Sequence, residues 1–265
     1  MTRPGLKVHH VTDFDTNSVC HTFTGCLWQL KGWSDKHPRH LPIMIDLELK
    51  TDAPACGSGG ICSDEATNWT LPRLLNVDAE IRSVLPPSQL IVPDDIRQGN
   101  LTLEDSILTH GWPSLASARG KFLFYFDNDP STPIRDLYRS NGSSSLENRV
   151  VFTNSVEGDA DGAFIKYNDP TNTTDIQRLV RKGYILRTRA DEPMDSVLNH
   201  DTSRRKLAFE SGAQIVSTDF PAYGMSSRYD WDYAVQLDGS LVGRCNPINS
   251  PEGCNDGDVS GVEAV

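Results

Sequence analysis

Apolar runs of strand length alternate along the chain with segments in which apolar residues recur at helical spacing. The runs predict strands at 6–11, 41–50, 121–127, 149–153, 163–168, 184–191 and 213–220. The helical spacing, seen first in Phe23, Leu27 and Leu30, predicts helices near 23–30, 74–84, 103–108, 134–138, 176–180 and 202–210. Because strands and helices alternate, we expect an α/β fold with a parallel sheet.

Several of these predicted strands end in polar residues. In the run LPIMIDLELK, residues 41–50, the side chains of Asp46, Glu48 and Lys50 share one face because they are two positions apart. Similar polar ends follow later strands, at Arg187, Arg189 and Asp219 among others. This pattern favours a TIM-type (β/α)8 barrel, whose active site lies at the carboxyl ends of its strands. A doubly wound sheet would more often carry a glycine-rich phosphate loop, and the sequence has none.

The number of predicted βα units indicates how much of a barrel the chain can form. About six βα units can be counted, whereas a closed barrel has about eight. We therefore expect a single barrel domain over residues 1–265 that is incomplete at its N-terminus by two strands. A segment at about 51–100, rich in Gly, Pro and Asp, is expected to be an irregular insertion that holds one helix.

Composition excludes two classes of protein. The 265 residues carry a net charge of −11, with a sequence pI near 5.0. A nucleic-acid-binding surface would be basic and clustered, so no nucleic-acid partner is expected. No apolar run approaches the roughly 18 residues that are needed to span a bilayer.

Cysteines and sequons indicate an extracellular protein. The six cysteines fall into three pairs close in sequence: Cys20 and Cys26, Cys56 and Cys62, Cys245 and Cys254. An even count favours disulfides, and local pairing is the simplest of about fifteen connectivities. Glycosylation sequons begin at Asn68, Asn100, Asn141 and Asn172. We therefore expect a secreted protein, although the first ten residues, MTRPGLKVHH, lack the apolar core of a signal peptide.

Several longer stretches, taken together and in order, resemble the secreted calcium-dependent phosphoinositide-specific phospholipase C family. These stretches are KVHHVTDFD, HPRHLPIMIDLELK, GWPSLASARGKFLFYFDN, YILRTRAD, SGAQIVSTDFP and RCNP. The resemblance implies a barrel enzyme that uses Ca²⁺ to cleave phosphatidylinositol-type lipids into diacylglycerol and inositol phosphate. It also implies transient contact with a membrane surface.

The resemblance assigns roles to a few residues. His10 matches the second of two family histidines, and Glu48 and Lys50 match a Glu-x-Lys motif in which the acid binds calcium. Asp46 is a further candidate ligand of the ion. The motifs that hold the first histidine and two more calcium acids are absent from this sequence, so we expect the activity of this chain alone to be impaired.

The residue types fit this chemistry independently of the family resemblance. Ca²⁺ prefers carboxylate oxygens, and a histidine that titrates near neutral pH can protonate a leaving oxygen. Lys50 can hold a phosphate as a point charge. The substrate-binding candidates are Lys50, Arg187, Arg189 and Asp219. His9 and His10 are adjacent, so a strand would direct only one of them to the site.

Other interpretations of the same residues remain open. Asp46, Glu48 and Lys50 could form an internal ion-pair ladder, and Arg187, Arg189 and Asp191 could pair with carboxylates rather than bind phosphate. Asp219 could cap the next segment. Two other functions also fit: a glycerophosphodiester phosphodiesterase with a similar barrel, or a barrel fragment without activity that binds phosphoinositide head groups or nothing.

Overall fold

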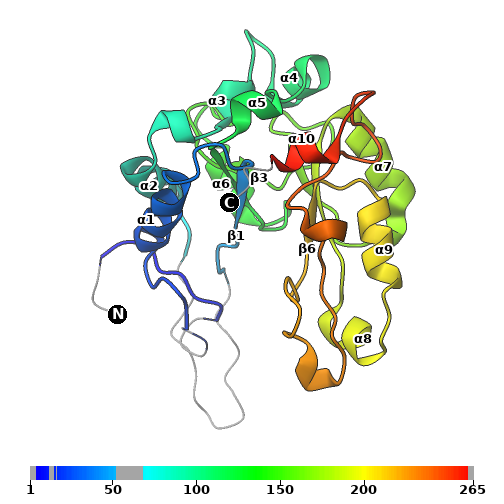
Figure 1. Ribbon diagram of the computed structural model, residues 1–265. Helices are drawn as coiled ribbons and strands as arrows, with labels where there is room; N and C mark the ends of the chain where they lie inside the picture. Colours follow the sequence, from blue (N-terminus) through cyan, green and yellow to red (C-terminus); the bar gives the residue numbers. More distant parts are fainter. Residues whose placement is uncertain (1–3, 12–14, 16, 52–67, 262–265) are drawn as a thin grey trace. The chain divides into compact units, whose positions relative to one another are not determined.

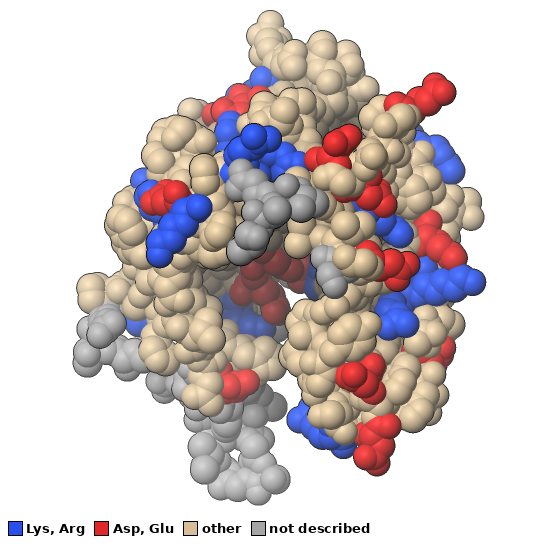
Figure 2. All heavy atoms as spheres, viewed as in Figure 1, with Lys and Arg blue, Asp and Glu red and all other residues tan. Residues whose placement is uncertain are grey.

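The structure is a computed structural model that describes residues 4–11, 15, 17–51 and 68–261 (Figure 1). The chain divides into two compact units. Unit 1 comprises residues 1–97 and 116–154, and unit 2 comprises residues 98–115 and 155–265. Acidic and basic side chains are interspersed over the face drawn in Figure 2. Among the described residues, no helix is both long and apolar enough to cross a membrane.

Unit 1 contains a parallel three-stranded sheet in the order β1-β2-β3. β1 (Ile43–Leu47) runs beside β2 (Phe122–Phe126), with Ile43 opposite Phe122, and β2 runs beside β3 (Phe152–Thr153). Every residue of β2 is buried, as expected for an apolar strand that is covered on both faces. All three strands lie within runs that the sequence predicts.

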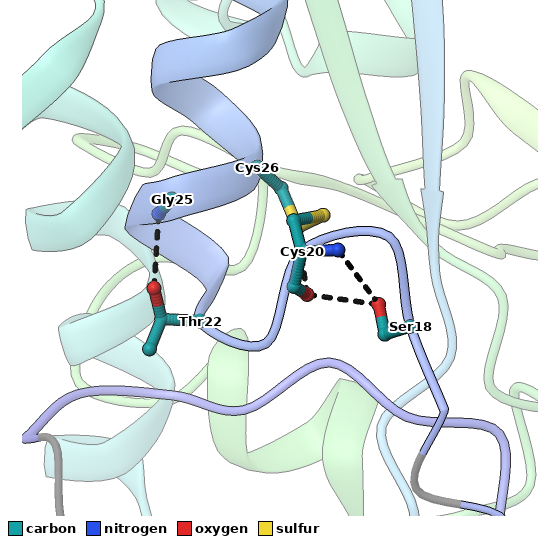
Figure 3. The surroundings of a disulfide bond; sticks show 5 residues. All are labelled: Ser18, Cys20, Thr22, Gly25 and Cys26. Carbon is teal, nitrogen blue, oxygen red and sulfur yellow. Dashed lines mark hydrogen bonds between the residues drawn. A yellow bond between two sulfur atoms is a disulfide. The ribbon is translucent and has the colours of Figure 1, made fainter.

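Two long helices, α1 (Phe23–Ser34) and α2 (Leu71–Val84), contact each other in unit 1. The hydroxyl of Thr22 accepts a hydrogen bond from the Gly25 backbone N–H at 3.2 Å, which satisfies one of the free donors at the start of α1 (Figure 3). The shorter helical segments are η1 (Pro87–Gln89), α3 (Pro93–Ile96), α6 (Pro133–Tyr138) and α5 (Leu115–Ala118), which begins in unit 2.

Unit 2 contains a second parallel three-stranded sheet, in the order β4-β5-β6. The strands are β4 (Phe164–Lys166), β5 (Ile185–Arg189) and β6 (Ile215–Ser217). In the register, Lys166 lies opposite Arg187, and Arg189 lies opposite Ser217. The polar ends of neighbouring strands therefore meet at one edge of this sheet.

Helices α7 (Thr173–Lys182) and α9 (Ser203–Glu210) both contact β5 and each other (Figure 1). Gly183 ends α7 with φ 107°, a left-handed conformation that glycine adopts without steric cost. The sequence predicts both helices. The other helical segments of unit 2 are α4 (Leu103–His110), η2 (Pro170–Asn172), α8 (Pro193–Leu198), η3 (Ser227–Tyr229), η4 (Asp238–Ser240) and α10 (Asp256–Ser260).

The prediction of a strand at 6–11 is wrong. This segment makes only isolated antiparallel bridges, Lys7 with Thr22 and Val11 with Asp15. The backbone N–H of Phe23 donates to the carbonyl of Leu6 at 2.9 Å, so the segment pairs locally with the start of α1. Apolar alternation shows that a segment is half buried, but it does not say which backbone becomes its partner.

The segment at about 51–100, predicted as an irregular insertion that holds one helix, is described only at residue 51 and from residue 68 onwards. Residues 52–67 lie outside the described part of the chain, whereas α2 is a fourteen-residue helix that buries Leu74, Val77 and Ile81. This helix confirms the one predicted within the insertion, but it belongs to the core of unit 1. The parallel α/β arrangement is confirmed within each unit, and closure of the strands into one barrel domain stays a prediction.

Candidate active site

A cavity of about 510 Å³ lies in unit 1 beside the carboxyl end of β1. Its walls include four residues that the sequence predicts for the site, His10, Asp46, Glu48 and Lys50. The cavity is completed by Gly5, Leu6, Lys7, Val8, His9, Phe23, Leu47, Leu49, Trp69 and Val77. Two histidines, two carboxylates and two lysines therefore face one space that also has apolar walls.

Glu48 and Lys50 are paired in this cavity. The Nζ of Lys50 lies 2.8 Å from Oε2 of Glu48, and the two side chains are 33% and 59% exposed respectively. Asp46, at the end of β1, is also exposed. Because these groups remain solvated, their charges are available to an incoming ion or phosphate without a large desolvation cost.

The backbone beyond β1 is fixed by two side chains that the sequence did not mark as important. Asn128 donates to the Leu49 carbonyl at 2.8 Å and accepts from the Leu49 N–H at 3.0 Å. The indole N–H of Trp69 donates to the carbonyl of Lys50 at 2.8 Å. These bonds fix the backbone at residues 49 and 50, from which the Lys50 side chain reaches Glu48.

His10 lies in a bend rather than in a strand, and its ring Nδ1 is 3.1 Å from Oδ2 of Asp15. A carboxylate beside one ring nitrogen orients the imidazole and leaves the other nitrogen for chemistry. The side chain is 75% exposed. The expectation that only one of His9 and His10 reaches the site is wrong, because both line the cavity once strand alternation is absent.

The donor set is of the kind that Ca²⁺ prefers, but it is small. Asp46 and Glu48 supply hard carboxylate oxygens. Among the described residues, no group of three or more His, Cys, Asp or Glu side chains lies together as a metal site. Two carboxylates therefore fit an ion whose remaining ligands are water or substrate oxygens.

The substrate-binding candidates of unit 2 lie at the ends of β5 and β6. Arg187 donates to Oδ1 of Asn168 at 3.1 Å. Arg189 lies 3.3 Å from Oδ2 of Asp219, which is 58% exposed. Arg189 and Asp219 are thus paired with each other. Convergence of these residues with His10, Glu48 and Lys50 stays a prediction.

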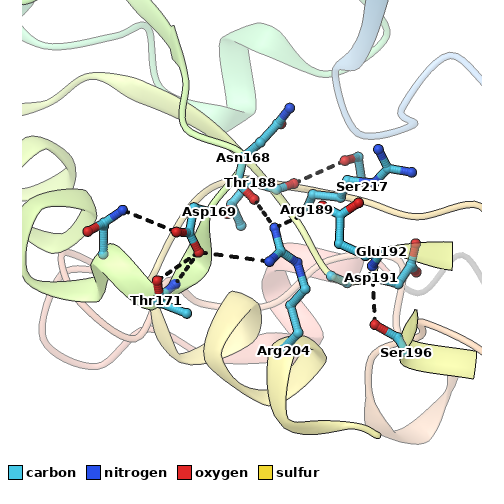
Figure 4. Close-up of polar contacts among 12 residues, drawn as sticks. Asn168, Asp169, Thr171, Thr188, Arg189, Asp191, Glu192, Ser196, Arg204 and Ser217 are labelled. Carbon is cyan, nitrogen blue, oxygen red and sulfur yellow. Dashed lines mark hydrogen bonds and ion pairs between the residues drawn. The ribbon is translucent and has the colours of Figure 1, made fainter. Parts of the chain in front are cut away.

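Arg204 of α9 supports this strand edge, and sequence reasoning missed it (Figure 4). Its guanidinium donates to the carbonyl of Asn168 at 2.7 Å and lies 3.3 Å from Oε1 of Glu192. It also lies 3.8 Å from Oδ1 of Asp169. One side chain therefore ties the loop after β4 to the loop after β5.

Asp191 has a structural role. It is fully buried and accepts hydrogen bonds from the Thr218 hydroxyl and from the Asp219 N–H, the latter at 3.4 Å. It joins the end of β5 to the end of β6 and does not share the partly exposed environment of Arg187 and Arg189.

Two of the three predicted disulfides are confirmed. The Cα atoms are 5.2 Å apart in Cys20–Cys26, which Figure 3 shows, and 6.0 Å apart in Cys245–Cys254. The predicted bond between Cys56 and Cys62 lies outside the described residues. The four sequon asparagines, Asn68, Asn100, Asn141 and Asn172, are all exposed, as a glycan would require, and their modification stays a prediction.

Carboxylates and cations at the ends of parallel strands, with two histidines beside those of unit 1, are groups suited to a phosphate ester and a metal ion. The chain belongs to the Ca²⁺-dependent phosphoinositide phospholipase C family, whose model matches residues 1–247. Membership in this family confirms the resemblance seen in the sequence, and the family is dependent on calcium.

Two solved structures are similar to this chain. One is a Ca²⁺-dependent phosphatidylinositol-specific phospholipase C enzyme from Streptomyces antibioticus, with a TM-score of 0.51 and 21% identity over 77% of this chain and 72% of that one. The other is a calcium-dependent phosphoinositol-specific phospholipase C from Pseudomonas sp., with a TM-score of 0.52 and 17% identity over 80% of this chain and 66% of that one. At these identities the likeness shows the fold. No curated protein matches the chain.

Proposed function

We propose that this protein is a secreted phospholipase C that uses Ca²⁺ to cleave phosphatidylinositol-type lipids into diacylglycerol and inositol phosphate. The phosphodiesterase class rests on the family, whereas the substrate and the use of Ca²⁺ by this chain are the proposal. The observation that carries it is the cavity of unit 1, which gathers a histidine, two acids and a lysine.

Each residue has a role that its surroundings support. Asp46 and Glu48 would hold Ca²⁺, which supplies Lewis-acid activation of the phosphate and of the neighbouring inositol hydroxyl when it is bound. Lys50 neutralises a phosphate oxygen. His10, oriented by Asp15, gives a proton to the departing diacylglycerol oxygen.

The ends of β5 and β6 are proposed to bind the head group. Arg187 and Arg189 lie on one face of β5 and are suited to phosphate oxygens, and Asp219 is suited to inositol hydroxyls. This assignment needs the strands of both units to close into a single (β/α)8 barrel, so that both sets of residues reach one mouth. Barrel closure, a single domain and glycosylation of a secreted protein are parts of the same proposal.

Ion binding can be tested without turnover, because Trp69 lies in the wall of the cavity. A Tb³⁺ ion bound by Asp46 and Glu48 should emit when tryptophan is excited, and Ca²⁺ should compete with it. The variant Glu48→Gln should bind at least about tenfold more weakly, since one of the two charges is lost. Asp136→Asn, which changes an exposed acid of α6, is the matched control.

Each outcome bears on the proposal. Sensitised emission that is lost in Glu48→Gln and kept in Asp136→Asn supports the site. Emission that is equal in all three proteins places the ion elsewhere and overturns the assignment. Release of glycerol phosphate from glycerophosphodiesters, without cleavage of phosphatidylinositol, would instead favour a glycerophosphodiester phosphodiesterase. If neither ion binding nor turnover is detected, a barrel without activity is the interpretation that remains.

A further inference from the structure

Three neighbouring segments of unit 1 carry a charge opposite to that of the chain as a whole. They are residues 31–40, which precede β1, residues 116–121, which precede β2, and residues 86–92. Together they contain five cationic side chains and one carboxylate, whereas the chain has a net charge of −11. We call the five cations the basic surface; they are Lys31, Lys36, Arg39, Arg119 and Lys121.

Hydrogen bonds hold the three segments together. The N–H of Gly120 donates to the carbonyl of His40 at 2.9 Å, which joins the first two segments. The side-chain amide of Gln89, in the third segment, donates to Oδ1 of Asp35 at 2.9 Å. Figure 2 shows basic side chains gathered over the part of the face where Figure 1 places α5 and the start of β1.

Three of these five charges are not neutralised by the described protein. Lys31 is paired, because its Nζ lies 2.7 Å from Oδ2 of Asp35. Within the part of the chain that the structure describes, Lys36, Arg39 and Lys121 form no ion pair, and the first two are exposed. An exposed cation without such a partner keeps its charge available to an anion in solution.

The backbone that carries these cations is ordered by ring contacts and hydrogen bonds. The rings of Trp33 and His37 stack with their centroids 4.6 Å apart. The Ser34 hydroxyl lies 2.8 Å from Nε2 of His40, whose ring is 5.6 Å from that of Phe122 at the start of β2. The cations of this segment are therefore presented by an ordered backbone, and little order is lost when they bind.

The basic surface lies at the opposite end of the strands from the proposed catalytic residues of unit 1. Its segments precede β1 and β2, so its cations lie at the amino ends of these parallel strands. Asp46 and Glu48 lie at the carboxyl end of β1, and a strand of five residues is about 16 Å long. A head group in the cavity is therefore too far away to be the anion that these cations bind.

The surroundings of the basic surface narrow the kind of anion. Clusters of lysine and arginine suit nucleic acids and heparin-like chains alike. A nucleobase stacks on an open aromatic face, but the half-exposed ring of Trp33 is already stacked on His37 and lies 5.2 Å from His40. The disulfide Cys20–Cys26 ties down the start of the same helix, α1, and disulfides persist mainly in secreted proteins. Outside the cell, sulfated and uronic polysaccharides are the abundant polyanions.

We propose that the basic surface binds an anionic polysaccharide through its sulfate or carboxylate groups. Arg39 can hold such a group with two parallel N–H donors, and Lys36 and Lys121 act as point charges. This inference goes beyond the proposed function, because it adds a binding surface that is separate from the catalytic residues. It rests on the proposed secretion of the protein. Since the attraction is electrostatic, binding weakens as the salt concentration rises.

The test is isothermal titration calorimetry of the full chain with a heparin decasaccharide at low salt, repeated with polygalacturonate. The double variant Lys36→Ala/Arg39→Ala should bind at least about tenfold more weakly, because two exposed charges are lost. The matched control is Lys206→Ala/Arg228→Ala, which removes the same charge from exposed positions of unit 2. Thermal unfolding confirms that each variant is folded.

Each result bears on the inference. Binding of both polymers that is weakened in the first variant and kept in the control supports it, and binding of heparin alone limits the partner to sulfated chains. No binding by the wild type, equal losses in the two variants, or binding that high salt leaves unchanged would overturn it. Tighter binding of single-stranded DNA of equal charge would assign the surface to a nucleic acid instead.

Failure of this inference can be distinguished from failure of the proposed function. The titration contains neither Ca²⁺ nor a lipid, and the substituted residues lie outside the cavity. Lys36→Ala/Arg39→Ala should therefore keep the sensitised Tb³⁺ emission of the wild type. Polysaccharide binding without cleavage of phosphatidylinositol would retain the basic surface and reject the proposed activity, and cleavage without polysaccharide binding would do the reverse.

Discussion

A buried carboxyl group in unit 1 makes the stability of the fold depend on pH in an uncommon direction. Asp78 of α2 is only 6% exposed, and its Oδ1 accepts a hydrogen bond of 2.5 Å from the Tyr138 hydroxyl. Its other oxygen, Oδ2, is buried without a hydrogen-bond partner. Burial raises the pKa of Asp78 to about 6, although the hydrogen bond from Tyr138 and the charges of Arg149 and Arg82 oppose the change.

The sign and size of the effect follow from linkage. Because the folded pKa lies above the ordinary value of 3.8, protonated Asp78 favours the folded state. This contribution is complete below about pH 4 and is lost as the pH rises through about 6. The pKa of Asp78 differs by about 2 between the folded and unfolded states. At about 1.4 kcal/mol for each pKa unit, this corresponds to about 3 kcal/mol of unfolding free energy.

The perturbation is Asp78→Asn, which keeps an acceptor for the Tyr138 hydroxyl but carries no charge. Between pH 4 and pH 8, the wild type should lose about 3 kcal/mol more unfolding free energy than the variant does. Urea unfolding followed by circular dichroism, repeated across this range, measures both slopes. Asp136→Asn, an exposed acid on α6, should retain the wild-type slope. Equal pH slopes for Asp78→Asn and the wild type would refute the reasoning.

Two further substitutions test local features. Arg178 and Lys182 lower the pKa of Glu157 to about 2, so the stability of the wild type should fall as the pH drops from about 4.5 towards 2. In acid unfolding curves, Glu157→Gln should reduce this fall by at most about 1 kcal/mol. Gly120→Ala should lower the unfolding free energy by at least about 2 kcal/mol, because Gly120 has φ +75° and an added Cβ would lie 2.3 Å from the Pro38 carbonyl. A melting temperature equal to that of the wild type would contradict the second prediction.

Sequence periodicity predicts most of the regular elements, because strands and helices bury their side chains at different spacings. β2 is buried at every position, and α7 has a one-sided apolar face followed by a glycine, so the sequence predicts the type of each element and places it to within a few residues. The segment at 6–11 has a similar pattern, but its partner is the nearby start of α1. That choice depends on the course of the chain from residue 11 to residue 22, which periodicity does not describe.

The sequence predicts those residues of the candidate site that belong to a local pattern or motif. Asp46, Glu48 and Lys50 are close in sequence, so alternation and a family motif both indicate them. Asn128 could not be predicted, because its contact with Leu49 joins residues that are 79 positions apart in the chain. Such contacts depend on the tertiary fold and leave no local pattern.

The cleavage assay tests the central claim most directly. Phosphatidylinositol vesicles are incubated with the protein in Ca²⁺ or in EDTA, and water-soluble inositol phosphate is followed by ³¹P NMR. The account predicts weak release, since the motifs for a further histidine and two more calcium acids are absent from this sequence. That release should require Ca²⁺ and should be lost in both His10→Ala and Glu48→Gln. Release that continues in EDTA, or that is unchanged in both variants, would contradict it.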